Sequence, residues 1–323
     1  AERSFTIAIE ADPAFAEAWA GRAAARAELG DSPHTLADLD RAIELSPRST
    51  EAYLTRIQTL SLDYETLWSR GGKVHDLHFE SLTELPDLRD DPEAKRLEAA
   101  IRADVAQVVA LGIKPEQARY FDGWLRRAQG DLDGALREFD AALEIWPYFA
   151  AGWEGRASLL LIRPQPDLAL AARDVERALQ LDPGSLRARG LRFYLALRRG
   201  EHLPALAELQ FLLQLRPRAA SLYVLRGYLK QHHLNDRPGA RADFEEALRH
   251  DPACILALLN LGAAHMEEGR LDEAVETFTE AARRNDRHAL VYYFRALTHL
   301  MASRRDSALA DLGRAVEIDP TFA

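Results

Sequence analysis

The segment AEAWAGRAAARAELGDSPHTLADLDRAIELSPRS, residues 16–49, is a 34-residue unit that returns along most of the chain. Counted from its first residue, Trp19 stands at position 4, Gly30 at position 15, Leu39 at position 24 and Pro47 at position 32. A glycine tolerates the left-handed backbone at which a helix ends, and a proline just past a helix prevents its continuation. The unit therefore predicts two helices, called helix A and helix B below, joined by a short turn.

The same spacing recurs with a period of about 34 residues. A second unit starts at Thr50 but loses the pattern after Leu60, and further units run from Glu116 to the end of the chain. The clearest copy is LLNLGAAHMEEGRLDEAVETFTEAA, residues 258–282. The glycines expected to end a helix A are Gly30, Gly130, Gly200 and Gly269.

These positions resemble the tetratricopeptide repeat (TPR) signature, which pairs an aromatic residue early in helix A with Ala, an aromatic and Pro in and after helix B. The resemblance implies an all-α, right-handed superhelical solenoid of about eight helix–turn–helix repeats. Ala, Leu, Arg and Glu are common in the chain, and they are good helix formers. The style of the repeats resembles that of bacterial TPR arrays.

Both ends of the sequence fall inside a repeat. Residues 1–15 align as a helix B alone, with Phe5 at position 24, and the chain stops three residues after Pro320. We therefore expect a fragment of a longer chain. The expected organisation is a partial repeat at 1–15, the first repeat and the second helix A at 16–63, an interruption at 64–98, and the remaining TPR array at 99–323.

The interruption at residues 64–98 has two interpretations. It contains Gly71, Gly72, Pro86 and Pro92, and helical periodicity returns only in EAKRLEAAIRADVAQVVALGI, residues 93–113. The segment is either an insertion between an extended helix A and its displaced helix B, or a degenerate repeat. His75 and His78 lie within it, but two histidines without a third suitable ligand do not predict a metal site.

An arginine occupies position 7 in most repeats, where the common TPR pattern has an apolar residue. An acid stands at position 23 on helix B of the same repeats, whereas the seventh repeat has Leu261 and Thr277 and lacks both charges. This pairing favours ion pairs within a repeat over a free anion-binding stripe. The predicted structural pairs are Arg22 with Asp38, Arg156 with Asp174, Arg192 with Glu208, Arg226 with Asp243, and Arg295 with Asp311.

The TPR resemblance implies that helix A lines a concave groove for a peptide or a partner helix. Reading the groove positions gives an aromatic, largely apolar set, and such surfaces suit apolar anchors. Phe121 and Phe294 have an alternative role, because they can pack between adjacent helices A. Of the two-carboxylate clamp that binds chaperone tails, only Asn260 is present, so no binding of such tails is expected. The predicted groove residues are Tyr120, Phe121, Trp124, Arg127, Tyr194, Arg198, Tyr228, Asn260, Tyr293 and Phe294.

The charge, the cysteine count and the apolar runs of the sequence limit which partners and which compartment are expected. The formal net charge is −10, which disfavours binding to a phosphate backbone, so no nucleic-acid partner is expected. One cysteine, Cys254, excludes an internal disulfide and favours a reducing compartment, and no apolar run is long enough to span a bilayer. We therefore expect a cytoplasmic protein with no membrane partner.

No catalytic constellation, phosphate-binding loop or metal-ligand spacing is visible, so no catalytic residue, cofactor or metal is predicted. The preferred function is a non-enzymatic protein–protein interaction scaffold that binds a peptide or partner helix in its groove. The alternative is a regulatory or substrate-recruiting TPR region of a larger enzyme, such as a kinase or protease. Self-association through uncapped helix faces at the truncated ends is a further expectation.

Overall fold

The computed structural model describes residues 1–71 and 91–322, which form seventeen α-helices and no strand. The fold is therefore all-α, as predicted. The helices are α1 (Glu2–Ala11), α2 (Ala16–Glu28), α3 (Ser32–Leu45), α4 (Thr50–Gly71), α5 (Pro92–Leu111), α6 (Pro115–Ala128), α7 (Leu132–Ile145), α8 (Ala150–Ile162), α9 (Leu168–Leu181), α10 (Leu186–Arg198), α11 (His202–Leu215), α12 (Ala220–His233), α13 (Arg237–His250), α14 (Ile255–Glu267), α15 (Leu271–Arg284), α16 (Ala289–Met301) and α17 (Arg305–Ile318).

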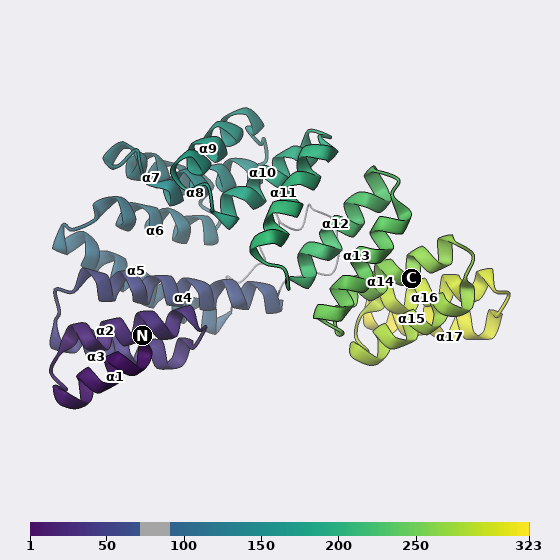
Figure 1. Cartoon of the computed structure of the whole chain (residues 1–323), viewed down its shortest axis with the longest axis horizontal. Helices are drawn as coiled ribbons and strands as arrows, with labels where there is room; N and C mark the ends of the chain where they lie inside the picture. Colours follow the sequence, from purple (N-terminus) through teal and green to yellow (C-terminus); the bar gives the residue numbers. More distant parts are fainter. Residues whose placement is uncertain (72–90, 323) are drawn as a thin grey trace. The chain divides into compact units, whose positions relative to one another are not determined.

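The chain divides into two compact units, Ala1–Leu191 and Arg192–Ala323. Within each unit, successive helices lie side by side and reverse direction at each turn (Figure 1). The even-numbered helices from α2 onward are helices A, and the odd-numbered ones are helices B. Most helices A pack most extensively against their own helix B, as in the pairs α6–α7, α12–α13 and α16–α17.

The predicted helix ends at glycine are confirmed by the backbone. Gly30, Gly130, Gly200 and Gly269 all have positive φ, between 71° and 81°. Two other helices A end at non-glycine residues in the same left-handed region, Asn235 at φ 53° and Ser303 at φ 60°. The turn geometry is thus retained where the glycine is missing, at some cost in backbone energy.

Close approach of helices A and B depends on a small residue beneath a large one. Phe139, Phe244 and Phe278 on helices B are at most 1% exposed. Each ring lies over a glycine of the paired helix A, and a Cβ added at Gly123, Gly227 or Gly262 would lie within 2.9 Å of the ring. These glycines therefore let the two helices of a repeat touch.

The second repeat departs from the common length. Its helix A, α4, has 22 residues, and its helix B, α5, has 20 residues, against 13 or 14 in most other helices. The two long helices pack together, and Ile57, Tyr64, Ile101 and Val108 form part of their shared core. Helix α5 is therefore the helix that pairs with α4. Most of the predicted 64–98 interruption, including His75 and His78, lies outside the described residues, and its assignment as an insertion stays a prediction.

We expect alanine substitution at two glycines of the second unit to act in opposite directions. Gly313→Ala in α17 adds a methyl group where no atom lies within 4 Å, and it should raise the free energy of unfolding by about 0.5–1 kcal/mol because glycine weakens a helix. Gly262→Ala forces a methyl group to 2.6 Å from the Phe278 ring, and it should lower that free energy by about 1–2 kcal/mol. Urea unfolding followed by circular dichroism measures both, and equal stabilisation by the two changes would contradict the packing argument.

Candidate partner-binding face

The first structural feature of the site is a set of arginines that hold helix A to helix B. Each predicted arginine lies against its predicted acid, and nitrogen–oxygen distances run from 2.5 to 2.8 Å. The acids are nearly inaccessible: the side chain of Asp174 is 2% exposed and that of Asp38 is 4% exposed. The pairs are therefore part of the repeat interior and do not form an open anion-binding stripe.

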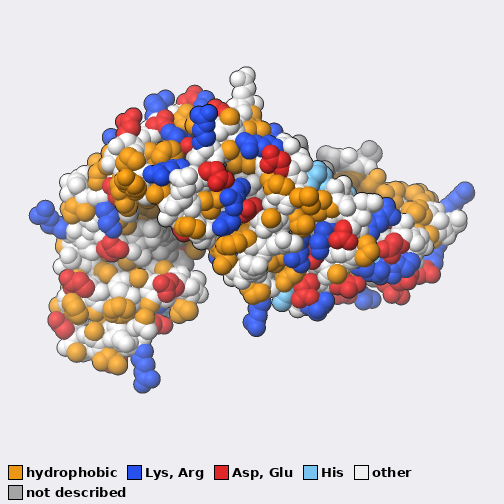
Figure 2. Space-filling model, turned by 45° about the horizontal axis from the view of Figure 1, so that its top comes forward, with side chains coloured by type: hydrophobic (Ala, Val, Ile, Leu, Met, Phe, Trp, Pro, Cys, Tyr) orange, Lys and Arg blue, Asp and Glu red, His pale blue; other side chains and the backbone are white. Residues whose placement is uncertain are grey.

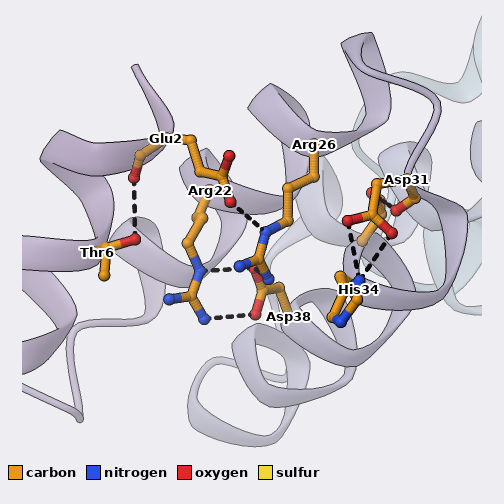
Figure 3. Close-up of polar contacts among 8 residues, drawn as sticks. Glu2, Thr6, Arg22, Arg26, Asp31, His34 and Asp38 are labelled. Carbon is orange, nitrogen blue, oxygen red and sulfur yellow. Dashed lines mark hydrogen bonds and ion pairs between the residues drawn. The ribbon is translucent and has the colours of Figure 1, made fainter.

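The first repeat shows how such a pair extends into a network (Figure 3). Arg22 on α2 donates two hydrogen bonds to the Asp38 carboxylate on α3, at 2.8 and 2.7 Å. Arg26, one turn further along α2, also donates to Asp38 and reaches Glu2 on α1, both at 2.8 Å. Three helices of consecutive half-repeats are thereby joined through two guanidinium groups.

Most of these arginines also lie over the aromatic residue at position 4 of their own helix A; the exception is Arg192, whose repeat has Arg189 at that position. Arg22 lies 4.8 Å from the Trp19 ring centroid, and Arg156 lies 4.8 Å from that of Trp153. The indole nitrogen of Trp19 in turn donates to the carbonyl of Pro13, at 3.0 Å, in the turn that precedes the repeat. The position-4 aromatic therefore connects the guanidinium to the preceding turn.

Sequence reasoning left one partner unassigned. Arg56 on α4 forms two hydrogen bonds with Asp104 on α5, at 2.8 and 2.5 Å, and one with Asp40 on α3, at 2.6 Å. The interruption after Leu60 hid Asp104, because the position count could not be carried across it. The signal that could have found it is the pairing rule itself, which requires an acid on the displaced helix B.

The pKa values of five of these guanidinium groups are raised, and the first cause is hydrogen bonding to the paired carboxylate. The five are Arg22, Arg56, Arg156, Arg226 and Arg295. The direction means that the folded chain stabilises the charged form of each arginine. Burial raises the pKa of the Asp174 carboxyl, and its hydrogen bond with Arg156 opposes that shift.

The second feature is the surface formed by the helices A, called the helix-A face below. Neighbouring helices A contact one another within each unit, as α2 does α4, α6 does α8, and α14 does both α12 and α16. The predicted groove residues all belong to these helices or to α10. Their exposure decides which of them a partner can reach.

Three predicted groove residues are not accessible. Phe121, Trp124 and Tyr194 are 7%, 6% and 5% exposed, so the prediction that they line an open groove is wrong for them. The burial of Trp124 is explained by Tyr64. Helix α4 continues past the usual end of a helix A, and the Tyr64 ring meets the Trp124 ring edge-on, with centroids 5.3 Å apart. Phe121 lies in the same core, as its alternative role anticipated, and Tyr194 is buried in α10 with its hydroxyl accepting a hydrogen bond from Arg198 at 3.0 Å.

The other predicted groove residues keep part of their surface. Tyr120 contacts Phe139 and Phe149, and its hydroxyl accepts a hydrogen bond from Arg187 at 3.3 Å. Phe294 stacks on the buried Phe278, with ring centroids 6.0 Å apart, so only one side of it is available. The residues that are partly or fully exposed are Tyr120, Arg127, Arg198, Tyr228, Asn260, Tyr293 and Phe294.

In the second unit this face is uncharged over a long stretch. Helix α14 carries no Lys, Arg, Asp or Glu before Glu267, and the one such residue of α16, Arg295, is directed to Asp311 at 2.6 Å. Asn260 and Tyr293 lie on these two helices. Figure 2 shows that elsewhere acidic, basic and hydrophobic side chains are interspersed on the face in view.

A buried carboxyl group on α8 is a residue that the sequence did not single out. Glu154 is 8% exposed and accepts a hydrogen bond from the Ser185 hydroxyl. Burial raises its pKa above the ordinary value. The position count alone gave no reason to expect a buried acid here.

The described residues meet neither the requirements for a metal site nor those for a membrane-spanning helix. No three His, Cys, Asp or Glu side chains of residues 1–71 and 91–322 are placed to hold a metal ion together. None of the helices in these ranges has the length and apolar character needed to cross a membrane.

A family model for the tetratricopeptide repeat matches residues 122–186, 234–284 and 266–321. The pairing of the helices, the packing of small residues under large ones and this match all indicate the same family. The chain belongs to the tetratricopeptide repeat family.

Curated TPR relatives match over short segments. The Hsp70-Hsp90 organizing protein of Triticum aestivum is 30% identical over 89 residues, which is 28% of this chain and 15% of that protein. The SGT1 homolog of Oryza sativa subsp. japonica is 48% identical over 52 residues, or 16% of this chain and 14% of that protein. The chain thus spans less than a fifth of the length of either relative.

Solved structures show the fold alone. Human IFIT1, crystallised as a dimer with m7Gppp-AAAA, has a TM-score of 0.59 at 15% identity, over 98% of this chain and 67% of that one. Pseudomonas aeruginosa pilF has a TM-score of 0.53 at 18% identity, over 64% and 92%. Yeast Tom70 has a TM-score of 0.51 at 17% identity, over 99% and 72%.

Removing one member of a buried TPR ion pair should cost far more than removing both. Asp174→Thr leaves the Arg156 guanidinium facing only the half-exposed Asp140, and we expect a loss of about 3 kcal/mol in the free energy of unfolding. Adding Arg156→Leu reproduces the natural Leu261 and Thr277 of the seventh repeat, and it should recover more than half of that loss. Urea unfolding followed by circular dichroism gives both values.

The matched control is the exposed pair Arg163–Asp133, at 2.8 Å. Asp133→Asn should change the free energy of unfolding by less than about 0.5 kcal/mol, because solvent screens exposed pairs. A double variant as unstable as Asp174→Thr alone would contradict the idea that the cost comes from an uncompensated buried charge.

The raised pKa of Glu154 predicts a pH-dependent effect. A carboxyl whose pKa is raised on folding contributes most stability below its unfolded pKa, and this contribution is lost as the pH rises through the folded value. Glu154→Gln keeps an acceptor for Ser185 and removes the charge. We expect the variant to gain stability relative to the parent as the pH is raised from about 5 to about 8. Urea midpoints at each pH test this, and a constant difference would contradict it.

Proposed function

We propose that this TPR chain is a non-enzymatic protein-interaction scaffold, and that it binds an extended peptide or partner helix against the helix-A face of its second unit. The observation that carries the proposal is the uncharged aromatic and aliphatic surface of α14 and α16, on which Tyr293, Phe294 and Asn260 keep accessible area. Aromatic anchors of this kind dominate the energy of many protein interfaces.

The polar and apolar groups of this surface suit a partner that inserts apolar side chains and donates a backbone hydrogen bond. Asn260 donates its side-chain amide to the Leu256 carbonyl of the same helix, at 2.7 Å, and its amide oxygen is an acceptor by chemistry. Met266 on α14 accepts a hydrogen bond from the hydroxyl group of Thr298 on α16 at its sulfur atom, at 3.4 Å. A methionine beside aromatic rings adapts to side chains of different shape.

Names of the curated relatives point in the same direction, since one is called an organizing protein for two chaperones. The match covers only 15% of that protein, so its partners are not assigned to this chain. The absence of a nucleic-acid partner, the cytoplasmic location, the bacterial origin and self-association through the ends stay predictions. So does the alternative that the chain is a recruiting region of a larger enzyme.

Selection from a random peptide library on the immobilised chain tests the proposal. We expect enriched peptides with apolar or aromatic anchors, and we expect Tyr293→Ala to weaken their binding at least tenfold, measured by calorimetry. The control is Tyr148→Ala, which removes a tyrosine of the first unit that is 64% exposed in the turn before α8. No enrichment, or equal loss in both variants, would overturn the proposal.

A further inference from the structure

A pocket of about 220 Å³ opens on the helix-A face of the first unit, between α2 and α4. It is smaller than the roughly 300–1,000 Å³ of sites that enclose a small-molecule ligand. Its size therefore suits one side chain of a partner. The lining residues are Ala27, Gly30, Ser32, Thr55, Gln58, Thr59, Leu62 and Asp63.

Small residues of the first repeat keep the pocket open. Ala27 on α2 contributes only a methyl group to the pocket lining. Gly30 has φ 77°, a conformation that favours glycine, and no atom lies within 4 Å of the place where its Cβ would be. The glycine that ends α2 therefore adds no side chain to this part of the pocket lining.

Hydroxyl groups in the pocket have their protons engaged elsewhere. Thr55 donates to the Glu51 carbonyl and Thr59 to the Thr55 carbonyl, each at 2.9 Å within α4. Ser32 donates to Oδ2 of Asp63, at 2.5 Å. Toward a ligand these three oxygens present lone pairs only. The pocket is thus rich in acceptors.

The charge of the pocket is negative. Asp63 is the one Asp, Glu, Lys or Arg among its lining residues. On α2, Arg26 stands next to Ala27 and is engaged with Asp38 and Glu2, and on α4 Arg56 is engaged with Asp104. Glu17 and Glu28 add exposed negative charge along α2. An anionic ligand would be repelled, and a metal ion would find one carboxylate where it needs several ligands.

We propose that this pocket binds a lysine or arginine side chain of the partner, a proposal that rests on the partner lying along the helix-A face. The cationic head group donates to the Asp63 carboxylate and to the Thr55 and Thr59 hydroxyl oxygens. Charge-assisted hydrogen bonds of this kind are stronger than neutral ones. Ala27 and Leu62 pack against the aliphatic stem, as long basic side chains allow.

Single-residue probes test the pocket without a peptide partner. N-acetyl-lysine methylamide and N-acetyl-arginine methylamide are titrated into the ¹⁵N,²H-labelled full chain and followed by NMR. The neutral norleucine and citrulline analogues serve as probes of equal shape. We expect the basic probes to shift the amide signals of Ser32, Thr55, Thr59 and Asp63, and the neutral analogues to bind at least about tenfold more weakly.

Two variants locate the effect. Asp63→Asn keeps the Ser32 hydrogen bond and removes the charge, and it should weaken the basic probes about tenfold. Ala27→Met fills the pocket without changing its charge, and it should abolish the shifts even if Asp63→Asn disturbs α4. The matched control, Glu17→Gln, removes an exposed acid from the other end of α2 and should change binding less than twofold. The spectrum of each free variant reports whether it is folded.

The inference is overturned if the neutral probes bind as well as the basic ones, if no pocket amide shifts, or if Ala27→Met leaves binding unchanged. These outcomes are independent of the peptide selection in the second unit. Loss of peptide binding with intact probe binding would overturn the proposed function alone, and the reverse would overturn the pocket alone.

Discussion

Most of this structure depends on a buried arginine–carboxylate pair that is repeated along the chain. The guanidinium at position 7 joins helix A to helix B, lies against the aromatic ring at position 4, and in some repeats also reaches the preceding helix B. Arg156 shows all three contacts: Asp174 at 2.8 Å, the Trp153 ring at 4.8 Å and Asp140 at 2.7 Å. A planar group with five donors is suited to such a role, and a lysine is not. The repeat thus has a polar centre that fixes the register between three helices.

This use of arginine determines what the surface can do. The guanidinium groups at position 7 are turned inward, so they add no positive charge to the outer surface of the helices A. In the second unit that leaves the aromatic and aliphatic surface around Tyr293, and in the first unit it leaves the acceptor-rich pocket beside Asp63. The two stretches have different chemistry although they stand on equivalent helices. The ion pairs stabilise the fold, while the remaining positions of helix A are free to differ between repeats.

The periodic part of the fold could be predicted from sequence, because each position has one physical task. Gly30 and its equivalents end helices, and the pairing of Arg22 with Asp38 follows from their spacing. The accessibility of Trp124 could not be predicted, because it depends on how far the neighbouring helix α4 continues, and Tyr64 lies beyond the usual end of a helix A. Asp104 was missed for a related reason: the position count breaks where the repeat length changes.

Small residues illustrate why position in a motif does not by itself assign a role. Gly262 lies under the Phe278 ring, and its lack of a side chain closes the contact between two helices. Gly30 and Ala27 line a pocket, to which they contribute no side chain and a single methyl group. The first repeat is rich in Ala and Gly, and its groove positions offer few side chains. Its contribution is the space that those residues leave, and the chemistry in that space comes from Asp63 and the threonines of the next helix A.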